Sequence, residues 1–178
     1  MKDYNTKYRL SKRALNWNWY LDLKRKPCTD CGETFDPYAM DWDHQVDKKE
    51  SPATLMAKSR NREVILNEIS KCELVCANCH RIRTYSQVPR WEYRPTELND
   101  TIQKLKYNKP CVDCGLLFPS VCMDFDHRDP SQKKYTIARM KSLSLKFLPA
   151  LLEEIAKCDL VCHCCHRLRT AKKSQWQS

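Results

Sequence analysis

Cysteine spacing is the feature that most narrows what this chain can fold into. The sequence contains four Cys-x-x-Cys pairs, and glycine directly follows the first and third of them. Two such pairs can wrap four thiolates around one tetrahedral zinc ion, and a closed set of four leaves no position for water. We therefore expect two structural zinc sites, made by Cys28, Cys31, Cys76 and Cys79, and by Cys111, Cys114, Cys162 and Cys165.

The placement of glycine supports zinc over a chance spacing. Gly32 and Gly115 are the only glycines of the chain, and each closes a first-pair turn that favours a residue tolerant of positive φ. The alternatives are disulfides, which form in oxidising compartments, and a redox-active Cys-x-x-Cys, which belongs to a catalytic site. The doubled pattern favours zinc over both. Cys164 lies between two predicted ligands, which leaves the ligand choice there ambiguous. The other cysteines are expected in the core: Cys72, Cys122 and Cys158.

The cysteine pairs belong to a longer internal repeat. The segment around the first pair and the Asp-His dipeptide return 83 residues later, whereas residues 68–84 return 86 residues later. The second copy thus carries three extra residues between these blocks. Two copies are too few for a solenoid. We predict two like domains, residues 1–88 and 89–178, divided within the proline-containing stretch 85–95.

Each copy predicts the same order of elements. A helix opens it, over 11–26 and 96–108, with Ser11 and Thr96 as N-caps. A short strand at 40–44 follows the first cysteine pair and places its two aspartates on the face opposite the histidine.

The second half of each copy follows the same plan. A helix precedes the second pair, supported in the second copy by leucine and isoleucine at helical spacing in 148–155. A second strand and a final helix complete the copy, the helix beginning near the last Cys-His.

Composition limits the class of protein. With 42% hydrophobic and 30% charged residues, two modules of this size have small hydrophobic cores and need additional cross-links to fold stably. Zinc ions would supply such cross-links. The net charge of +10 suits a polyanionic partner. We find no apolar run long enough to span a membrane and no signal peptide at Met1, so we expect a cytoplasmic protein, in the host cell if it is viral, with no membrane partner.

Four of the five histidines occupy repeat-matched positions. Asp43-His44 and Asp126-His127 end the predicted first strands, and His80 and His166 directly follow the last zinc cysteines, whereas His163 has no counterpart. An aspartate and a histidine with an open coordination sphere can hold a divalent cation, and a neighbouring neutral histidine can accept a proton from water. The alternative is that each Asp-His pair caps an element or supports another group. Asp41 and Asp124 also repeat, and we expect them to support a ligand or to lie at the surface.

The order Cys-x-x-Cys-Gly, Asp-His and Cys-x-x-Cys-His resembles the zinc-bearing, phage-type branch of the HNH endonucleases. It occurs twice, and the two copies together cover nearly the whole chain. The resemblance implies an α+β fold of two tandem ββα-metal (His-Me finger) modules forming a pseudo-dimer. It implies that Asp43 and His80 hold one catalytic cation, Mg²⁺ or Mn²⁺, and that Asp126 and His166 hold another. His44 and His127 would then be the general bases.

This chain departs from the family at the middle asparagine, which helps to orient the base. Spacing places that position near Cys72 and Cys158, so a backbone carbonyl or another side chain must take over, or activity is reduced. Asn61 or Asn78 is a candidate in the first copy only.

Basic residues predict contacts with DNA. Arg81, Arg83, Arg167 and Arg169 follow the late histidines and are natural phosphate clamps, the alternative being an ordinary solvated helix face. Residues 24–26 are a further basic run. The stretch 7–20 mixes basic and aromatic residues and either reaches DNA or packs between the copies.

The expected function is therefore a DNA endonuclease that acts as a monomeric pseudo-dimer, with one site per strand. In a second version of this function, only one copy is catalytic and the enzyme nicks one strand. The second copy, with Arg128-Asp129-Pro130 after its motif, resembles the family more closely and would then be the active one. A different class is a non-catalytic tandem zinc module that binds nucleic acid, which explains the charge and the cysteines but not the repeated Asp-His and trailing histidine.

Overall fold

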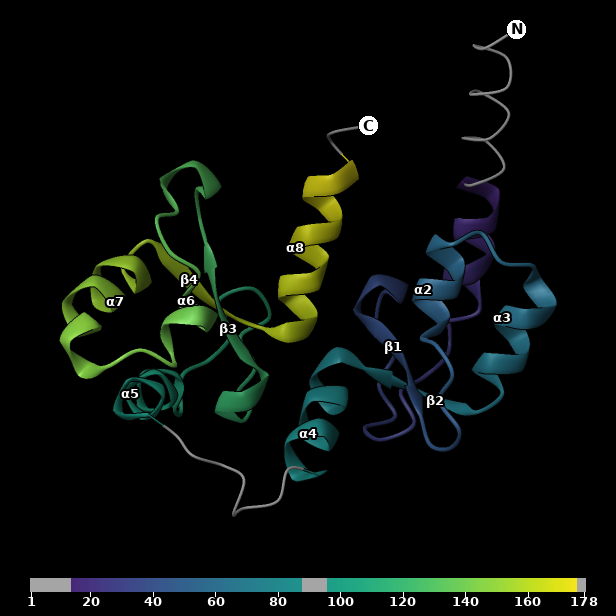
Figure 1. The fold of residues 1–178 in the computed structure, drawn as a ribbon, viewed down its shortest axis with the longest axis horizontal. Coiled ribbons are helices and arrows are strands. Elements are labelled where there is room, and N and C mark those ends of the chain that lie inside the picture. Colours follow the sequence, from purple (N-terminus) through teal and green to yellow (C-terminus); the bar gives the residue numbers. More distant parts are fainter. Residues whose placement is uncertain (1–13, 88–95, 176–178) are drawn as a thin grey trace, which may run out of the picture. The chain divides into compact units, whose positions relative to one another are not determined.

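The computed structural model describes residues 14–87 and 96–175, and the chain divides into two compact units, Met1–His80 and Arg81–Ser178 (Figure 1). The division falls within helix α4 (Ala77–Gln87), ahead of the predicted boundary at residues 88/89. Residues 88–95, which include most of the predicted linker, lie outside the described residues, as does Ser11, the predicted first N-cap.

The first unit is a two-stranded antiparallel sheet with helices packed around it. Strands β1 and β2 pair so that Met40 lies opposite Cys76 and His44 opposite Cys72. Residues 14–22 are helical, within the predicted 11–26. The remaining elements are η1 (Pro37–Ala39), β1 (Met40–His44), α2 (Pro52–Ala57), α3 (Arg62–Ile69), β2 (Cys72–Cys76) and the start of α4.

Local sequence explains where the two short helices of this unit begin. The Ser51 hydroxyl accepts a hydrogen bond from the backbone N–H of Thr54, and a proline stands in the first turn of α2. The Asn61 side chain accepts one from the N–H of Val64 and caps α3. Asn61 is thus an N-cap and not a substitute for the family's asparagine.

The second unit repeats this plan, with β3 and β4 antiparallel and Met123 opposite Cys162. Thr96 accepts from the Asn99 N–H, which confirms the predicted N-cap of α5. The three extra residues fall between α6 and α7, where η4 adds a turn, so that α3 and α7 match under the shift of 86. Its elements are α5 (Glu97–Lys106), η2 (Ser120–Cys122), β3 (Met123–His127), η3 (Pro130–Gln132), α6 (Ile137–Met140), η4 (Leu145–Phe147), α7 (Leu148–Ile155), β4 (Cys158–Cys162) and α8 (His163–Gln175).

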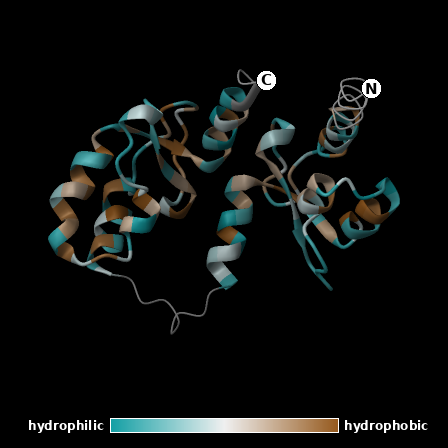
Figure 2. Cartoon of the chain, turned by 45° about the horizontal axis from the view of Figure 1, so that its top comes forward, coloured by the Kyte–Doolittle hydropathy of each residue, from teal (hydrophilic) through white to brown (hydrophobic). Residues whose placement is uncertain are grey.

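Each unit has its own small hydrophobic core. In the first, Tyr20, Leu55, Met56 and Ile65 are buried, with Trp17, Trp19, Trp42 and Ile69 packed on them. In the second, the buried residues are Leu98, Ile102, Ile137, Met140, Leu151 and Cys158. Hydrophobic residues are concentrated in α7, whereas α4, α5 and α8 are mostly hydrophilic (Figure 2).

These cores correct two expectations. The aromatic residues Trp17, Trp19 and Tyr20 pack in the core of the first unit, and residues 7–13 of the predicted stretch lie outside the described residues. Lys24, expected to follow a DNA backbone, is 5% exposed and donates to the Met40 carbonyl at 2.7 Å. Lys106 makes the equivalent bond to Met123 at 2.6 Å. In both cases the basic side chain ties the opening helix to the first residue of a strand.

The mixed α+β class and the predicted order of helices and strands are confirmed in both units. Among residues 14–87 and 96–175, no helix has the length and apolar character that crossing a membrane requires.

Candidate metal centres

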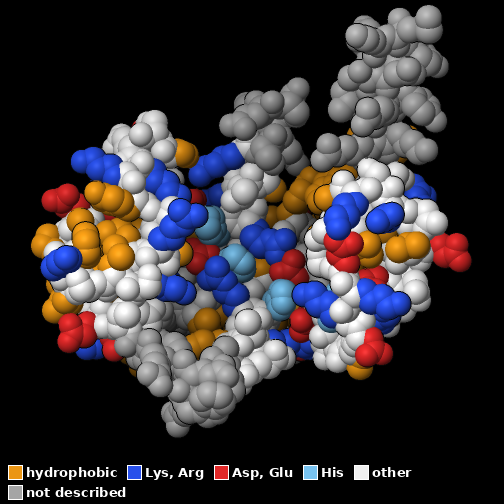
Figure 3. Space-filling model, in the orientation of Figure 1, with side chains coloured by type: hydrophobic (Ala, Val, Ile, Leu, Met, Phe, Trp, Pro, Cys, Tyr) orange, Lys and Arg blue, Asp and Glu red, His pale blue; other side chains and the backbone are white. Residues whose placement is uncertain are grey.

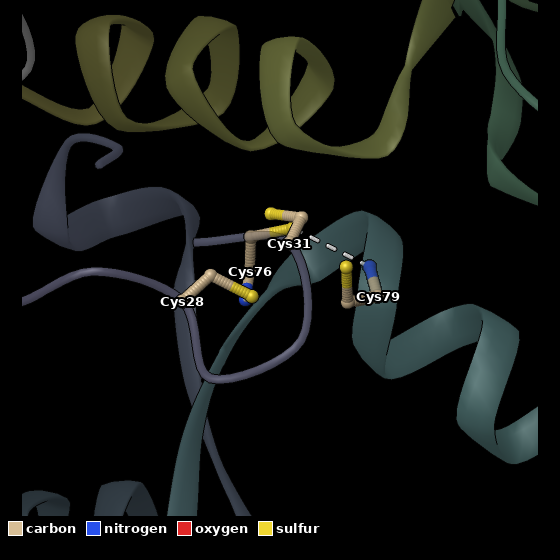
Figure 4. Close-up of side chains that lie close together, drawn as sticks. All are labelled: Cys28, Cys31, Cys76 and Cys79. Carbon is tan, nitrogen blue, oxygen red and sulfur yellow. Dashed lines mark hydrogen bonds between the residues drawn. The ribbon is translucent and has the colours of Figure 1, made fainter. Parts of the chain in front are cut away.

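The eight predicted zinc cysteines form two clusters, one in each unit. In the first, the ligand atoms of Cys28, Cys31, Cys76 and Cys79 all lie within 4.8 Å of one another. Figure 4 shows the four sulfur atoms gathered between the 28–31 turn, the end of β2 and the start of α4. The second cluster has the same spacing and consists of Cys111, Cys114, Cys162 and Cys165. Cys164 is buried and stands outside this set, which resolves the ambiguity over the ligands.

The turns under the sulfur atoms have the form that a metal-binding knuckle needs. Gly32 and Gly115 both have φ of +73°, as predicted. The backbone N–H of Cys76 points at the Cys28 sulfur at 3.2 Å, and the N–H of Cys162 points at the Cys111 sulfur at 3.2 Å. Such N–H groups stabilise negative charge on sulfur. Both tetracysteine groups can hold a structural zinc ion.

The chemistry of the clusters also calls for a cation. Burial raises the pKa of the Cys79 and Cys165 thiols, and neighbouring cysteines raise it further. Four thiolates this close repel one another unless a cation neutralises them, and zinc binding displaces the protons. Cys72 and Cys158 differ, because burial raises the pKa of each thiol to about 11 and each S–H bonds a backbone carbonyl one turn back. Cys158 lies in the core of the second unit, as expected, whereas Cys72 is half-buried.

A second group of metal-ligand residues lies beside the zinc knuckle of the first unit. His80, on the first turn of α4, faces both aspartates of β1: its Nδ1 lies 3.1 Å from Asp41 Oδ2, and its Nε2 lies 3.4 Å from Asp43 Oδ1. Because a carboxylate accepts, Nδ1 carries the proton toward Asp41 and the Nε2 lone pair faces Asp43. Asp41 thus fixes the orientation and tautomer of the imidazole, as carboxylates do for metal-binding histidines.

The second unit repeats this arrangement. His166 Nδ1 lies 2.9 Å from Asp124 Oδ2, and His166 Nε2 lies 3.6 Å from Asp126 Oδ1. Neighbouring ligands of an octahedral cation with bonds of about 2.1 Å lie about 3.0 Å apart, so the spacings of 3.4 and 3.6 Å need to close by only roughly half an ångström. The residues therefore fit the predicted cation, which either pair would bind together with water and substrate oxygens.

Asp124 has a further partner that the sequence did not identify as part of a site. Its Oδ2 also lies 2.8 Å from Nδ1 of His163, the first residue of α8. Burial raises the Asp124 pKa, but hydrogen bonds from both histidines and the nearby Arg81 guanidinium outweigh it and hold the pKa well below its usual range. Asp124, His163 and His166 form a third group able to hold a metal. The only sequence signal for it was the unmatched histidine.

The predicted general bases are oriented by buried glutamates. His44 Nε2 lies 2.9 Å from Glu68 Oε1, and His127 Nε2 lies 2.7 Å from Glu154 Oε1. Hydrogen bonds from Lys71 and the Lys49 backbone N–H lower the Glu68 pKa to about 2.

Glu154 is ionised for similar reasons. Burial raises its pKa, but bonds from Lys157 and His127 outweigh it and bring the pKa to about 2. Ionised carboxylates only accept, so Nε2 of each histidine carries the proton and Nδ1 keeps the lone pair. Among the described residues, Nδ1 of neither His44 nor His127 has a hydrogen-bond partner.

The structure brings together some of the predicted catalytic residues but not all of them. Asp43 meets His80, and Asp126 meets His166, as expected. The histidine that follows each aspartate instead contacts a glutamate of α3 or α7, and its side chain is 7% exposed. No described contact joins that histidine to the Asp-His pair.

The predicted arginine clamps have different environments. Arg169 is not a free phosphate clamp: it binds Asp113 in bidentate fashion and reaches Asp126 at 3.2 Å and Asp159 at 3.0 Å. Arg81, the first residue of the second unit, donates to Asp124 Oδ1 at 2.6 Å. Arg83 and Arg167 are half-buried on α4 and α8. The sequence did not show that aspartates neutralise two of these arginines.

Histidine side chains are visible on the surface, with basic and acidic side chains around them (Figure 3). His80 is 37% exposed, His166 33% and His163 23%, so solvent ions can reach them.

Comparison of the chain with protein-family models, with curated proteins and with solved structures gave no match.

Proposed function

We propose that this protein is a metal-dependent DNA endonuclease, built from two HNH-type ββα-metal modules that act within one chain as a pseudo-dimer. The observation that carries the proposal is made in both units. A histidine after the zinc knuckle has Nδ1 held by one aspartate while its Nε2 faces a second aspartate at 3.4 or 3.6 Å. In the first unit, that second aspartate forms an ion pair with His80.

The proposed chemistry assigns a role to each of these side chains. Asp43 with His80, and Asp126 with His166, would hold a divalent cation such as Mg²⁺ or Mn²⁺. Such a cation, when bound, offsets the negative charge that develops on the oxygens of the scissile phosphodiester. His44 and His127 would each take a proton from water at Nδ1, the ring nitrogen whose lone pair is available.

Glu68 and Glu154 take the place of the family's orienting asparagine. Each anchors Nε2 of the base and also accepts from a backbone N–H of the following loop, Lys49 at 2.9 Å and Lys134 at 2.9 Å. The ionised carboxylate stabilises the imidazolium that forms once the base has accepted a proton, as a buried aspartate does beside a catalytic histidine. The missing asparagine therefore does not weaken the proposal.

DNA is the proposed partner because the chain carries a net charge of +10. Lys and Arg side chains are numerous on the face that Figure 3 shows, on which histidine side chains are also exposed, and such basic side chains would bind a phosphate backbone. Non-specific binding of this kind is expected to weaken steeply with salt.

The test is cleavage of supercoiled plasmid by the full chain with Mg²⁺ or Mn²⁺. We expect nicked or linear product from the wild type. His44→Ala and His127→Ala should each remove one site, and the double variant should lower the rate by at least about 100-fold, the contribution of a general base. Full cleavage by the double variant would overturn the assignment of the bases.

Two controls keep this test sharp. Removing His127 takes one hydrogen-bond donor from the buried Glu154 carboxylate, so Asp43→Asn and Asp126→Asn provide a second, isosteric pair of variants aimed at the cation. Asp129→Asn changes a nearby exposed carboxylate that caps η3, and should cleave normally. Circular dichroism then shows that each variant is folded.

The runner-up function is a non-catalytic zinc module that binds nucleic acid. One observation favours it in the second unit: Asp126 Oδ2 already faces Arg169 at 3.2 Å and Lys173 at 3.7 Å, two cations that compete with a metal. Salt-dependent DNA binding, with no cleavage in the presence of any divalent metal ion, would establish this function and rule out the nuclease.

A further inference from the structure

We propose that the second unit holds an additional transition-metal site, made by Asp124, His163 and His166, for which the first unit lacks a ligand. The three ligand atoms, Asp124 Oδ2 and Nδ1 of each histidine, lie within 4.8 Å of one another. Two imidazoles and one carboxylate are a donor set for Zn²⁺, Co²⁺ or a similar first-row ion, with a coordination position left open.

The backbone presents these ligands to a common point. His163 and His166 are three residues apart at the start of α8, so both project from one face of the helix. Their ring centroids are 6.3 Å apart, with the rings inclined by 70°. Asp124 lies opposite them on β3, and Arg81 occupies its Oδ1, leaving Oδ2 for the two imidazoles.

Distances and exposure allow an ion to enter. The carboxylate oxygen lies 2.8 and 2.9 Å from the two nitrogens, whereas neighbouring ligands of a tetrahedral zinc are about 3.3 Å apart. An opening of roughly half an ångström is therefore enough. The side chains of Asp124, His163 and His166 are 15%, 23% and 33% exposed, which gives them freedom to move and the ion a path from solvent.

The first unit supplies a natural comparison. It contains two of the three ligands, since Asp41 Oδ2 lies 3.1 Å from His80 Nδ1. Ala77 begins α4 where His163 begins α8. The first unit therefore lacks the third ligand and should hold no ion at the corresponding position.

The site also constrains the neighbouring Asp126–His166 pair. A neutral imidazole has one lone pair, so a metal on Nδ1 of His166 leaves N–H at Nε2, which then cannot bind the cation of the proposed nuclease. On the proposed function, Zn²⁺ in this site would inhibit cleavage by the second unit and spare the first. This consequence rests on that function, whereas metal binding itself does not.

The decisive experiment measures metal binding without DNA. Full-length protein with its thiolate sites filled is titrated with Zn²⁺ by calorimetry, and separately with Co²⁺. We expect one equivalent that depends on His163, beyond any ion held by the Asp43–His80 and Asp126–His166 pairs, with Co²⁺ absorption that lacks the thiolate charge-transfer band. His163→Ala and Asp124→Asn should weaken that step by more than about 100-fold, since even an outer partner of a ligand contributes 10- to 100-fold.

The outcomes separate the two proposals. No further equivalent in the wild type, or an unchanged one in His163→Ala, would overturn the site whatever the nuclease assay shows. If binding is confirmed, cleavage is measured with Mg²⁺ plus Zn²⁺ in the His44→Ala background, where only the second unit works. Zn²⁺ should inhibit there, and His163→Ala should relieve the inhibition. If the enzyme binds Zn²⁺ at this site but its cleavage rate does not fall, only the proposed competition is refuted.

Discussion

At the scale of single residues, the buried glutamates of α3 and α7 have the most influence on the candidate site. Glu154 is 1% exposed and bonds His127, Lys157 and the backbone N–H groups that follow Lys133. One carboxylate thus fixes a predicted base, a lysine and a loop together. Glu68 has the same set of partners in the first unit.

Replacing Glu154 with glutamine tests this role. The amide still accepts from one donor, but it loses the charge that pairs with Lys157, so we expect the free energy of unfolding to fall by about 1–3 kcal/mol. Urea denaturation measures it. Glu153→Gln is the matched control, because Glu153 is exposed on the same helix and should change stability by less than about 0.5 kcal/mol. Equal losses in both variants would contradict the role given to Glu154.

The residues that the sequence identified and those that it missed differ in a simple way. Cysteines and glycines in this pattern have few structural uses, so their spacing alone predicted the cysteine clusters, whereas the Asp43–His80 and Asp126–His166 pairs were predicted from the resemblance to HNH endonucleases. Glutamates are common on helix surfaces, and nothing local marks Glu68 as buried rather than solvated. Its role depends on contacts 24 residues away, which only the fold reveals.

At the scale of elements, a lysine joins the opening helix to the sheet in each unit. The Lys106 amine donates to the Met123 carbonyl at 2.6 Å, so that α5 is fixed to the first residue of β3. Burial lowers the Lys106 pKa to about 8, although Asp124 acts in the opposite direction. Its counterpart Lys24 belongs to the basic run that the sequence predicted to follow a DNA backbone, because charge alone does not distinguish a lysine bound to a buried carbonyl from one free in solvent.

This pKa predicts how stability depends on pH. A lysine with a lower pKa in the folded state favours folding fully above its unfolded value of 10.5, and that contribution is lost as pH falls through about 8. Wild type should therefore lose up to about 3 kcal/mol relative to Lys106→Met between pH 10.5 and 8. Chemical denaturation across this range measures the difference. Lys104→Met, which changes an exposed lysine on the same helix, should track the wild type; a Lys106→Met variant that also tracks it would refute the assigned pKa.

At the scale of the whole molecule, the repeat predicted two like units, and each has a separate core and cysteine cluster. The sequence placed the boundary by composition, at 88/89, because prolines mark linkers. The contacts place the boundary at 80/81, inside α4. This helix carries the last cysteine of the first zinc knuckle and continues beyond the boundary. Composition cannot show that a helix crosses a boundary.

Separate cores imply that each unit depends on its own zinc. A structural zinc site contributes about 10–16 kcal/mol to folding, which matches or exceeds the 5–15 kcal/mol total stability of a typical domain. Cys31→Ser should therefore unfold the first unit alone, and Cys114→Ser the second. Both cysteines are exposed, so neither change opens a cavity. In Co²⁺-substituted protein, each variant should lose half of the thiolate charge-transfer absorption. Amide spectra should show one set of dispersed signals collapsing while the other persists. Collapse of both sets in either variant would mean that the two cores stabilise each other, and that the repeat is one cooperative domain.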